Sequence, residues 1–213
     1  MSSPQSHYEE LLASFSDQRR AAELLKHHRP YFEKIPSIRR ADESIITIPL
    51  PIIKVKQRLF QPPKVGHDIP YELITIPCDL ALLMCDPEWQ IKTDIEVFVF
   101  IHRFGEELSD LLSRWRETQV LLSRGYSWEM PLHYQHIFSE GAEKAYPLFV
   151  LAPQTSSRIH QGLKGAALPA VTIAAPMPDP SADLADFSSR LDEDIVEASA
   201  SLGEEASRIQ PLE

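Results

Sequence analysis

The apolar run from Ile95 to Ile101 constrains the fold of this 213-residue chain more than any other segment. Its sequence, IEVFVFI, consists of β-branched and aromatic residues, and its single polar residue, Glu96, lies near its start. A strand that is apolar on both faces has to be covered on both faces. We therefore expect Ile95–Ile101 to be a central strand with other elements packed above and below it.

The segment after this strand carries the clearest helical pattern in the chain. Between Glu106 and Arg124, apolar and long side chains recur every three or four residues, at Leu108, Leu111, Leu112, Trp115, Gln119 and Leu122. This spacing predicts an amphipathic helix, and Gly125 is typical of a helix C-terminal stop. A buried strand followed by a long helix favours the α+β class: a small mixed or antiparallel sheet, one long packed helix and an N-terminal helix.

Residues 8–28 are expected to form that N-terminal helix. Their apolar side chains fall near one stripe of a helix, at Leu11, Leu12, Phe15, Ala22 and Leu25. Ser6 is the expected N-cap residue, with Glu9 three residues further on as its partner in a capping box. Pro30 is expected to stop the helix, because proline cannot continue it.

Proline is abundant in this chain and glycine is scarce, with 18 and 7 residues, and asparagine does not occur. Hairpins with two-residue loops are therefore not expected, because those loops need residues that adopt positive φ. Pro49 and Pro51 place the extended segment around them at a sheet edge or where the chain bends between sheets. The remaining expected elements are strands over 45–48, 52–56, 71–76 and 148–151, a helical turn over 79–85 and a helix over 136–144.

The composition predicts three regions. Residues 1–153 are expected to form a single globular α+β domain, residues 154–181 a flexible Pro/Ala/Ser linker, and residues 182–213 a disordered acidic tail. Within the tail, apolar residues recur at helical spacing, at Leu184, Phe187, Leu191 and Ile195. This stripe predicts an amphipathic helix that binds a partner protein.

Charge is distributed unevenly along the chain, whose net charge is -10. Residues 171–213 contain 10 acidic and 2 basic side chains, whereas residues 19–64 contain 11 basic and 4 acidic ones. Cations interleaved with aromatic side chains can hold a single-stranded nucleic acid. The candidate polyanion-binding residues are Arg19, Arg20, Arg39, Arg40, Lys54, Lys56 and Arg58. The acidic tail would compete with such a ligand for this basic segment.

No motif in the sequence identifies an enzyme. His133 and His136 could share one helix face as metal ligands, but the H-E-x-x-H pattern is absent. Asp86 and Glu88 could act as acid and base, although Asp-Pro is also a common turn initiator. Nucleophile elbows and glycine-rich phosphate-binding loops are missing. We therefore expect no catalytic site, no metal site and no cofactor.

Cys78 and Cys85 are seven residues apart and do not form a C-x-x-C motif. We expect both to be buried, reduced thiols, which is typical of proteins in a reducing compartment. No apolar run reaches the roughly 18 residues of a membrane-spanning helix, and the N-terminus lacks the basic region of a signal peptide. These features favour a cytoplasmic protein that does not insert into a membrane.

The function that these patterns favour is that of a cytosolic protein–protein interaction protein: an adaptor, an accessory subunit or a chaperone-like partner. The partner would be another protein, bound by the tail helix. The alternative is a small nucleic-acid-binding regulator that uses residues 19–64 and is autoinhibited by its acidic tail. A weaker third hypothesis is a hydrolase that uses Asp86, Glu88, His133 and His136.

Overall fold

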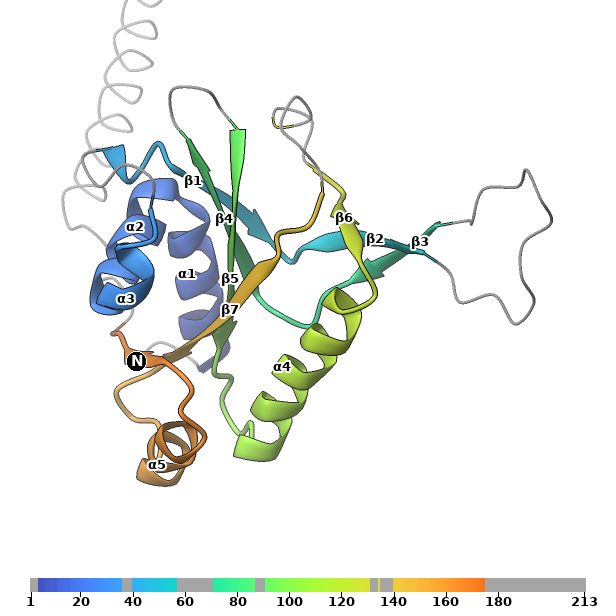
Figure 1. The fold of residues 1–213 in the computed structure, drawn as a ribbon. Helices are drawn as coiled ribbons and strands as arrows, with labels where there is room; N and C mark the ends of the chain where they lie inside the picture. The colour runs from blue at the N-terminus through green and yellow to red at the C-terminus, as the bar shows by residue number, and fades with distance from the viewer. Residues whose placement is uncertain are drawn as a thin grey trace, which may run out of the picture. The chain divides into compact units, whose positions relative to one another are not determined.

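The computed structural model describes residues 4–35, 40–56, 71–86, 91–130, 134 and 140–174. Within these residues the chain forms five helices and eight strands in two sheets, which confirms the α+β class (Figure 1). The helices are α1 (Pro4–Ser16), α2 (Gln18–His27), α3 (Arg29–Phe32), α4 (Leu108–Leu122) and α5 (Ser157–Gly165). The strands are β1 (Ile45–Pro49), β2 (Ile52–Lys56), β3 (Tyr71–Thr75), β4 (Leu80–Asp86), β5 (Ile91–Ile101), β6 (Tyr126–Trp128), β7 (Lys144–Leu151) and β8 (Ala170–Thr172).

The larger sheet has the strand order β1-β4-β5-β7-β8, so β5 lies in its middle. β4 is antiparallel to both β1 and β5, whereas β7 is parallel to both β5 and β8, and the sheet is therefore mixed. The predicted central strand Ile95–Ile101 is confirmed as part of β5. Its residues Val97–Ile101 are each 1% exposed or less, which is possible only for a strand covered on both faces.

Alternate residues of β5 contribute to two separate hydrophobic cores. Val97, Val99 and Ile101 point to the layer formed by α1, α2 and α3. Phe98 and Phe100 point to the other layer, which contains α4, α5 and the smaller sheet (Figure 1). The predicted long helix is confirmed as α4, which packs its side chains onto the second of these cores. The larger sheet is thus the middle layer of three, as a strand apolar on both faces requires.

The smaller sheet has the order β3-β2-β6, and all its strand pairs are antiparallel. Between β1 and β2 the chain bends from one sheet into the other at the Pro49-Leu50-Pro51 segment, where Leu50 has a positive φ of 45°. This is the bend between sheets that the two prolines predict. Ile53 and Val55 face the larger sheet and are buried, so the even-numbered residues of β2 face outward.

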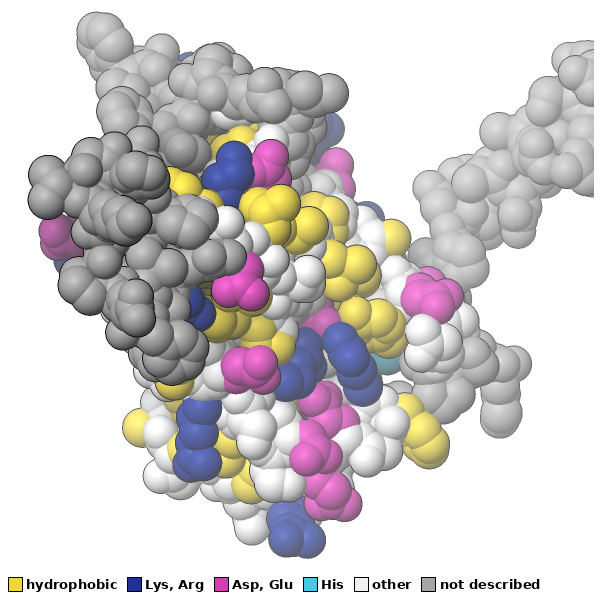
Figure 2. Space-filling model, turned by 90° about the vertical axis from the view of Figure 1, so that its right-hand side faces the viewer, with side chains coloured by type: hydrophobic (Ala, Val, Ile, Leu, Met, Phe, Trp, Pro, Cys, Tyr) yellow, Lys and Arg dark blue, Asp and Glu magenta, His cyan; other side chains and the backbone are white. Residues whose placement is uncertain are grey.

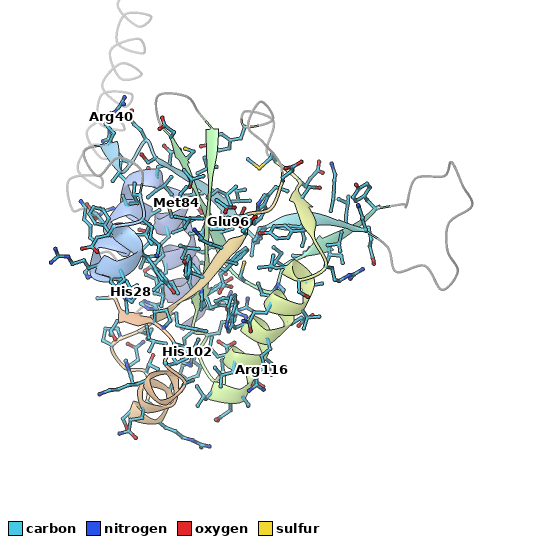
Figure 3. All side chains as sticks on the ribbon, viewed as in Figure 1. His28, Arg40, Met84, Glu96, His102 and Arg116 are labelled. Atoms are coloured by element: carbon cyan, nitrogen blue, oxygen red, sulfur yellow. The ribbon has the colours of Figure 1, made fainter. Side chains whose placement is uncertain are left out.

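The buried carboxylate of Glu96 joins the smaller sheet to β5 (Figure 3). It accepts hydrogen bonds from Trp128 Nε1 at 2.7 Å, from the backbone amide of Ala142 at 3.1 Å and from the Tyr126 hydroxyl. Burial, together with this neighbouring carboxylate, raises the pKa of Tyr126 well above the usual tyrosine range. Three donors compensate for the loss of water around Glu96, so a carboxylate is tolerated in the core.

The predicted single helix over residues 8–28 is wrong, because the chain forms two helices there. Asp17 interrupts them: its side chain accepts hydrogen bonds from the amides of Arg19 and Arg20, at 2.9 and 3.1 Å, and so acts as the N-cap of α2. Ser6 lies inside α1, which begins at Pro4, rather than at its N-cap. α2 ends at His27, one residue before the predicted end, and Pro30 does not act as a helix stop but lies in the first turn of the next helix, α3.

The helical turn expected over residues 79–85 is also wrong, since these residues form β4. Every residue from Leu80 to Cys85 is buried, so the segment is apolar on both faces, and such a short run does not distinguish a strand from a helix. The helix expected over 136–144 is contradicted at its C-terminal end, where Glu140 forms a β-bridge with Ser127 and Lys144 begins β7. Residues 135–139 lie outside the described residues.

The globular domain extends beyond the predicted boundary at residue 153. The chain divides after Ala175, and the first compact unit is Met1–Ala175. α5 and β8 both belong to the first unit, where Leu163 is fully buried and Val171 is nearly so. Residues 154–174 are therefore part of the domain and not a linker. The predicted tail helix with Leu184, Phe187, Leu191 and Ile195 lies outside the described residues.

Truncation tests this boundary. We expect a chain that ends at Ala175 to keep its Tm within about 3 °C of the full chain, because the first compact unit is intact. A chain that ends at Pro169 loses β8, the burial of Val171 and the hydrogen bond from the Ile173 amide to the Leu151 carbonyl. Its Tm should fall by about 5 °C or more. Thermal unfolding followed by circular dichroism measures both, and equal Tm values for the two truncated chains would contradict this boundary.

Candidate functional site

A fully buried carboxylate, that of Asp79, lies directly before β4 and accepts four hydrogen bonds. One carboxylate oxygen accepts hydrogen bonds from the Tyr8 hydroxyl and Arg103 Nη2, both at 2.9 Å. The other accepts from the Ile101 amide at 2.7 Å and from Arg114 Nη2 at 2.5 Å. Burial and the nearby Asp79 carboxylate raise the pKa of Tyr8. Four donors, two of which are guanidinium groups, compensate for the burial of this charge.

This network extends from Asp79 to the loop that follows β5. Arg114 also donates to the Glu106 carboxylate at 3.2 Å and to the carbonyl oxygens of Pro77 and Ile101 at 3.1 and 3.3 Å. Glu106 accepts a further hydrogen bond from the Arg103 amide at 2.9 Å. The loop from His102 to Glu107 is therefore held at both of its ends by buried or half-buried ionic contacts.

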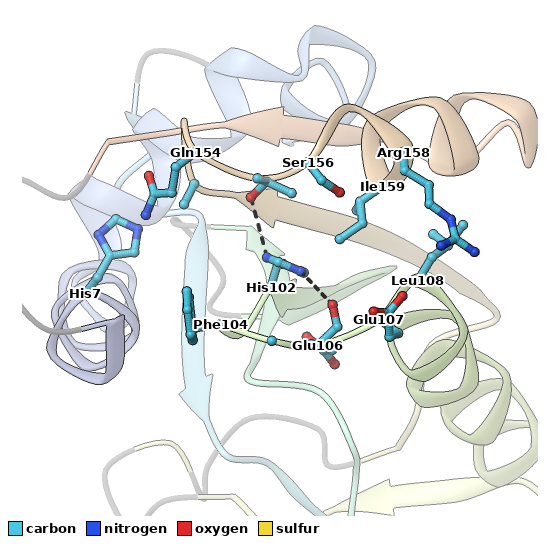
Figure 4. Close-up of a pocket in the computed structure, with 13 residues that line it drawn as sticks. His7, His102, Phe104, Glu106, Glu107, Leu108, Gln154, Ser156, Arg158 and Ile159 are labelled. Carbon is cyan, nitrogen blue, oxygen red and sulfur yellow. Dashed lines mark hydrogen bonds between the residues drawn. The ribbon is translucent and has the colours of Figure 1, made fainter.

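The same loop lines a cavity of about 250 Å³, here called the strand-end cavity (Figure 4). β5 and β7 are parallel, so their carboxyl ends lie at one edge of the sheet, and the residues that follow these two strands form the cavity walls. The lining residues are His7, His102, Phe104, Gly105, Glu106, Glu107, Leu108, Ala152, Gln154, Thr155, Ser156, Arg158 and Ile159. Ligand sites in sheets with parallel strands commonly lie beyond the carboxyl ends of the strands.

His102 occupies the middle of the strand-end cavity, with both ring nitrogens engaged (Figure 4). Nε2 lies 3.1 Å from the carbonyl oxygen of Glu106, and Nδ1 lies 3.4 Å from Thr155 Oγ1. Because a carbonyl oxygen only accepts, Nε2 has to carry a hydrogen. In the neutral ring Nδ1 is then the acceptor for the Thr155 hydroxyl. The imidazole therefore connects the loop after β5 to the turn that precedes α5.

Three other lining residues have side chains that a bound molecule could contact. His7 Nε2 is buried without a hydrogen-bond partner. Phe104 is 81% exposed, which leaves a large apolar side chain in contact with water. Ser156, the N-cap residue of α5, makes no side-chain capping hydrogen bond, and the first turn of α5 contains no acidic residue. A bound molecule in the cavity could satisfy each of these groups.

A second candidate surface is the side of the smaller sheet that faces away from the larger one. We call it the outer face, and it consists of Ile52, Lys54, Lys56, Tyr71, Leu73 and Thr75. The register pairs Lys54 with Leu73 and Lys56 with Tyr71 across the two strands. Figure 2 views the molecule from the side on which β2 and β3 lie, and it shows apolar side chains among Lys, Arg, Asp and Glu.

The structure divides the predicted polyanion-binding residues between two layers. Arg19 and Arg20 belong to α2, whereas Lys54 and Lys56 belong to β2, and α2 and β2 cover opposite faces of the larger sheet. Most of these cations also have carboxylate partners nearby, in the pairs Arg19–Asp42, Arg20–Glu23, Arg40–Glu43 and Lys54–Glu129. Arg39 and Arg58 lie outside the described residues. Residues 19–64 therefore do not form one continuous basic surface among the described residues.

Of the residues predicted as acid, base or metal ligands, Asp86 alone lies in the described part of the chain. Asp86 is the last residue of β4, while Glu88, His133 and His136 lie outside the described residues. No three His, Cys, Asp or Glu side chains among the described residues are placed to hold a metal ion. Cys78 and Cys85 are both free and buried, as predicted. Burial is the main reason that the pKa of Cys85 is raised to about 11 and that of Cys78 is raised well above its usual value.

Comparison with known proteins adds no relative to this description. No protein-family model, no curated protein and no solved structure matches the chain. Within the described residues, none of the helices combines the length and the apolar character that crossing a bilayer requires. The candidate sites therefore depend on the chemistry and geometry of this chain alone.

Removing the Asp79 carboxylate should strongly destabilise the domain. Asp79→Ala leaves Arg114, whose side chain is only 14% exposed, without its closest counter-charge, and we expect a loss of about 3 kcal/mol or more in the free energy of unfolding. Tyr8→Phe removes a single hydrogen bond to the same carboxylate and should cost about 1 kcal/mol. Urea unfolding measures both. A loss for Asp79→Ala no larger than that for Tyr8→Phe would contradict the central role of this carboxylate.

Proposed function

We propose that this chain is a cytoplasmic protein–protein interaction protein, such as an adaptor, an accessory subunit or a chaperone-like partner, and that its outer face binds another protein. One observation supports this most directly. Six large apolar side chains are exposed among the described residues, and four of them, Leu50, Ile52, Tyr71 and Leu73, lie on β2, β3 or the turn before β2. Apolar side chains gathered on one surface favour an interaction site.

The charges around these side chains indicate what kind of partner would fit. Lys54 and Lys56 lie on the outer face beside Leu73 and Tyr71, and among the described residues Lys54 is ion-paired with Glu129 whereas Lys56 has no carboxylate within 4 Å. A complementary partner would present apolar side chains to Ile52 and Leu73 and carboxylates to the two lysines. The predicted tail helix with Leu184, Phe187, Leu191 and Ile195 remains a second proposed binding element for a protein partner.

Site-specific photo-crosslinking in the native cell tests the outer face. We expect a photoreactive residue at position 73 of the full chain to form an adduct with one particular protein, whereas the same residue at position 120 should not. Val120 is a matched control because it is similarly exposed, at 59% against 62% for Leu73, but lies on α4. Mass spectrometry identifies the adducts.

The purified partner then provides a quantitative measurement. Leu73→Ser with Tyr71→Ser should weaken its binding at least about tenfold, because exposed aromatic and apolar anchors concentrate binding energy. Val120→Ser should leave the Kd unchanged. Identical adducts from positions 73 and 120, or an adduct only with a second copy of this chain, would show that the outer face does not bind a separate protein.

The alternative function, nucleic-acid binding, has one specific observation in its favour. Lys56 and Tyr71 are paired across β2 and β3, so a cation and an aromatic ring lie next to each other on an exposed sheet face. Sheet surfaces with this combination hold single-stranded nucleic acids by stacking and charge. In this proposal the acidic tail would compete with the nucleic acid for the lysines.

Two double variants distinguish these functions. If a single-stranded RNA binds the outer face, Lys54→Gln with Lys56→Gln should lower its affinity about tenfold or more at low salt and reduce the salt dependence of binding. Arg19→Gln with Arg20→Gln should have little effect, because α2 covers the opposite face of the larger sheet. Fluorescence anisotropy with a labelled oligonucleotide measures both. Equal losses in the two variants would indicate non-specific charge attraction, and no binding by the original chain would eliminate this alternative.

A further inference from the structure

We propose that the strand-end cavity binds a small carboxylic acid with an apolar body. This site is separate from the outer face and does not depend on the function proposed for that face. The cavity lies beyond the carboxyl ends of β5 and β7, and its walls come from α1, the loop after β5, and the turn that leads into α5. A cavity of about 250 Å³ can enclose a molecule of roughly ten non-hydrogen atoms.

Three exposed polar side chains that line this cavity, Gln154, Ser156 and Arg158, can each donate hydrogen bonds. Arg158 lines the cavity without a carboxylate partner within 4 Å in the described structure, and its guanidinium group is always charged. Ser156 has a hydroxyl that does not cap α5, and Gln154 contributes a side-chain amide. Because His102 is already bonded at both nitrogens, it adds no free acceptor in its neutral form. Ser156 and Gln154 can donate as well as accept, and Arg158 only donates, so together the three favour a ligand group that accepts several hydrogen bonds, such as a carboxylate.

Two acidic residues also line the cavity, and their positions affect whether the cavity favours an anionic ligand. The Glu106 carboxylate is bonded to Arg114 and to the Arg103 amide, so its charge is compensated outside the cavity. Glu107 is exposed at the start of α4, where an acidic side chain is favourable for the helix dipole. The buried part of the cavity is therefore lined by His7, His102 and neutral side chains. Glu107 lies at the rim, where its negative charge repels an anionic group that comes close.

The apolar residues of the cavity indicate the rest of the ligand. Phe104, Leu108, Ala152 and Ile159 contribute apolar surface, and Phe104 is 81% exposed. Figure 4 shows the Phe104 ring beside His102, between the His7 side of the cavity and the α4 side. An aromatic or aliphatic body placed against this ring would remove its surface from water. An inorganic anion would fill the polar part of the cavity and leave Phe104 exposed.

Ligand-observed ¹⁹F NMR with 4-fluorobenzoate and the full-length protein tests this site. We expect saturable binding, which Arg158→Gln should weaken about tenfold through loss of a charge-assisted contact, and which Phe104→Ala should also weaken severalfold. Arg116→Gln and Val120→Ala should not change the Kd. Arg116 is a matched control because it is exposed, lacks a carboxylate partner within 4 Å in the described structure, and lies on α4 (Figure 3). Val120 is an exposed apolar residue of the same helix.

Three comparisons make the result decisive. 4-Fluorobenzyl alcohol, which has the same ring without the charge, should bind at least about tenfold more weakly. Inorganic phosphate should not displace 4-fluorobenzoate at equal concentration. Thermal unfolding checks that every variant is folded. The proposal is wrong if 4-fluorobenzoate shows no saturable binding, if Arg158→Gln and Arg116→Gln have equal effects, or if phosphate binds and the benzoate does not.

Discussion

The buried carboxylate of Asp79 connects every layer of this domain. Tyr8 reaches it from α1 on one side of the larger sheet, Arg114 reaches it from α4 on the other side, and the Ile101 amide reaches it from the end of β5. Its own backbone is paired as well, since the Asp79 amide donates to the Val99 carbonyl and the Asp79 carbonyl accepts from the Leu50 amide. A carboxylate that is buried away from water needs all these donors at the same time. Its burial therefore fixes the positions of the two helices and of the strand ends relative to one another.

Sequence patterns predicted one long strand and one amphipathic helix, and missed a helix boundary set by a single side chain and a short buried strand. The strand Ile95–Ile101 follows from its run of β-branched and aromatic residues, and helix α4 follows from its single apolar stripe. The division between α1 and α2 depends instead on the Asp17 side chain binding two amides, although aspartate is also common on the surface of a continuous helix. β4 was misassigned because six consecutive buried residues have neither the period of a strand nor that of a helix.

The candidate sites were harder to predict, because they depend on which residues become neighbours. The basic segment 19–64 is continuous in sequence, but its residues lie on opposite faces of the larger sheet and are mostly paired with nearby carboxylates. The cavity residues His102, Thr155 and Arg158 were not predicted at all. Their one sequence signal is position: polar residues that directly follow the strands ending at Ile101 and Leu151. This signal can be recognised only when β5 and β7 are known to be parallel neighbours in the sheet. The apolar run Ile95–Ile101 alone does not show which strand lies beside it.

The two surfaces are held by different buried carboxylates but share one hydrophobic core, which contains Ile53 and Trp128 of the smaller sheet and Ile159 of the strand-end cavity. The loop that lines the strand-end cavity is held by the Asp79 network, so the cavity walls are fixed before a ligand arrives, and little conformational entropy remains to be lost on binding. The outer face belongs to the smaller sheet, which is attached to β5 by the hydrogen bonds of Glu96 and by the stacking of Trp128 on Phe98 at 6.0 Å.

The described hydrogen bonds of the Asp79 and Glu96 carboxylates involve no common side chain. Among the described residues, the polar contacts that hold the cavity loop and those that hold the smaller sheet are therefore separate. Coupling between the two surfaces would pass through the shared apolar core and through β5, which carries Glu96 and donates the Ile101 amide to Asp79.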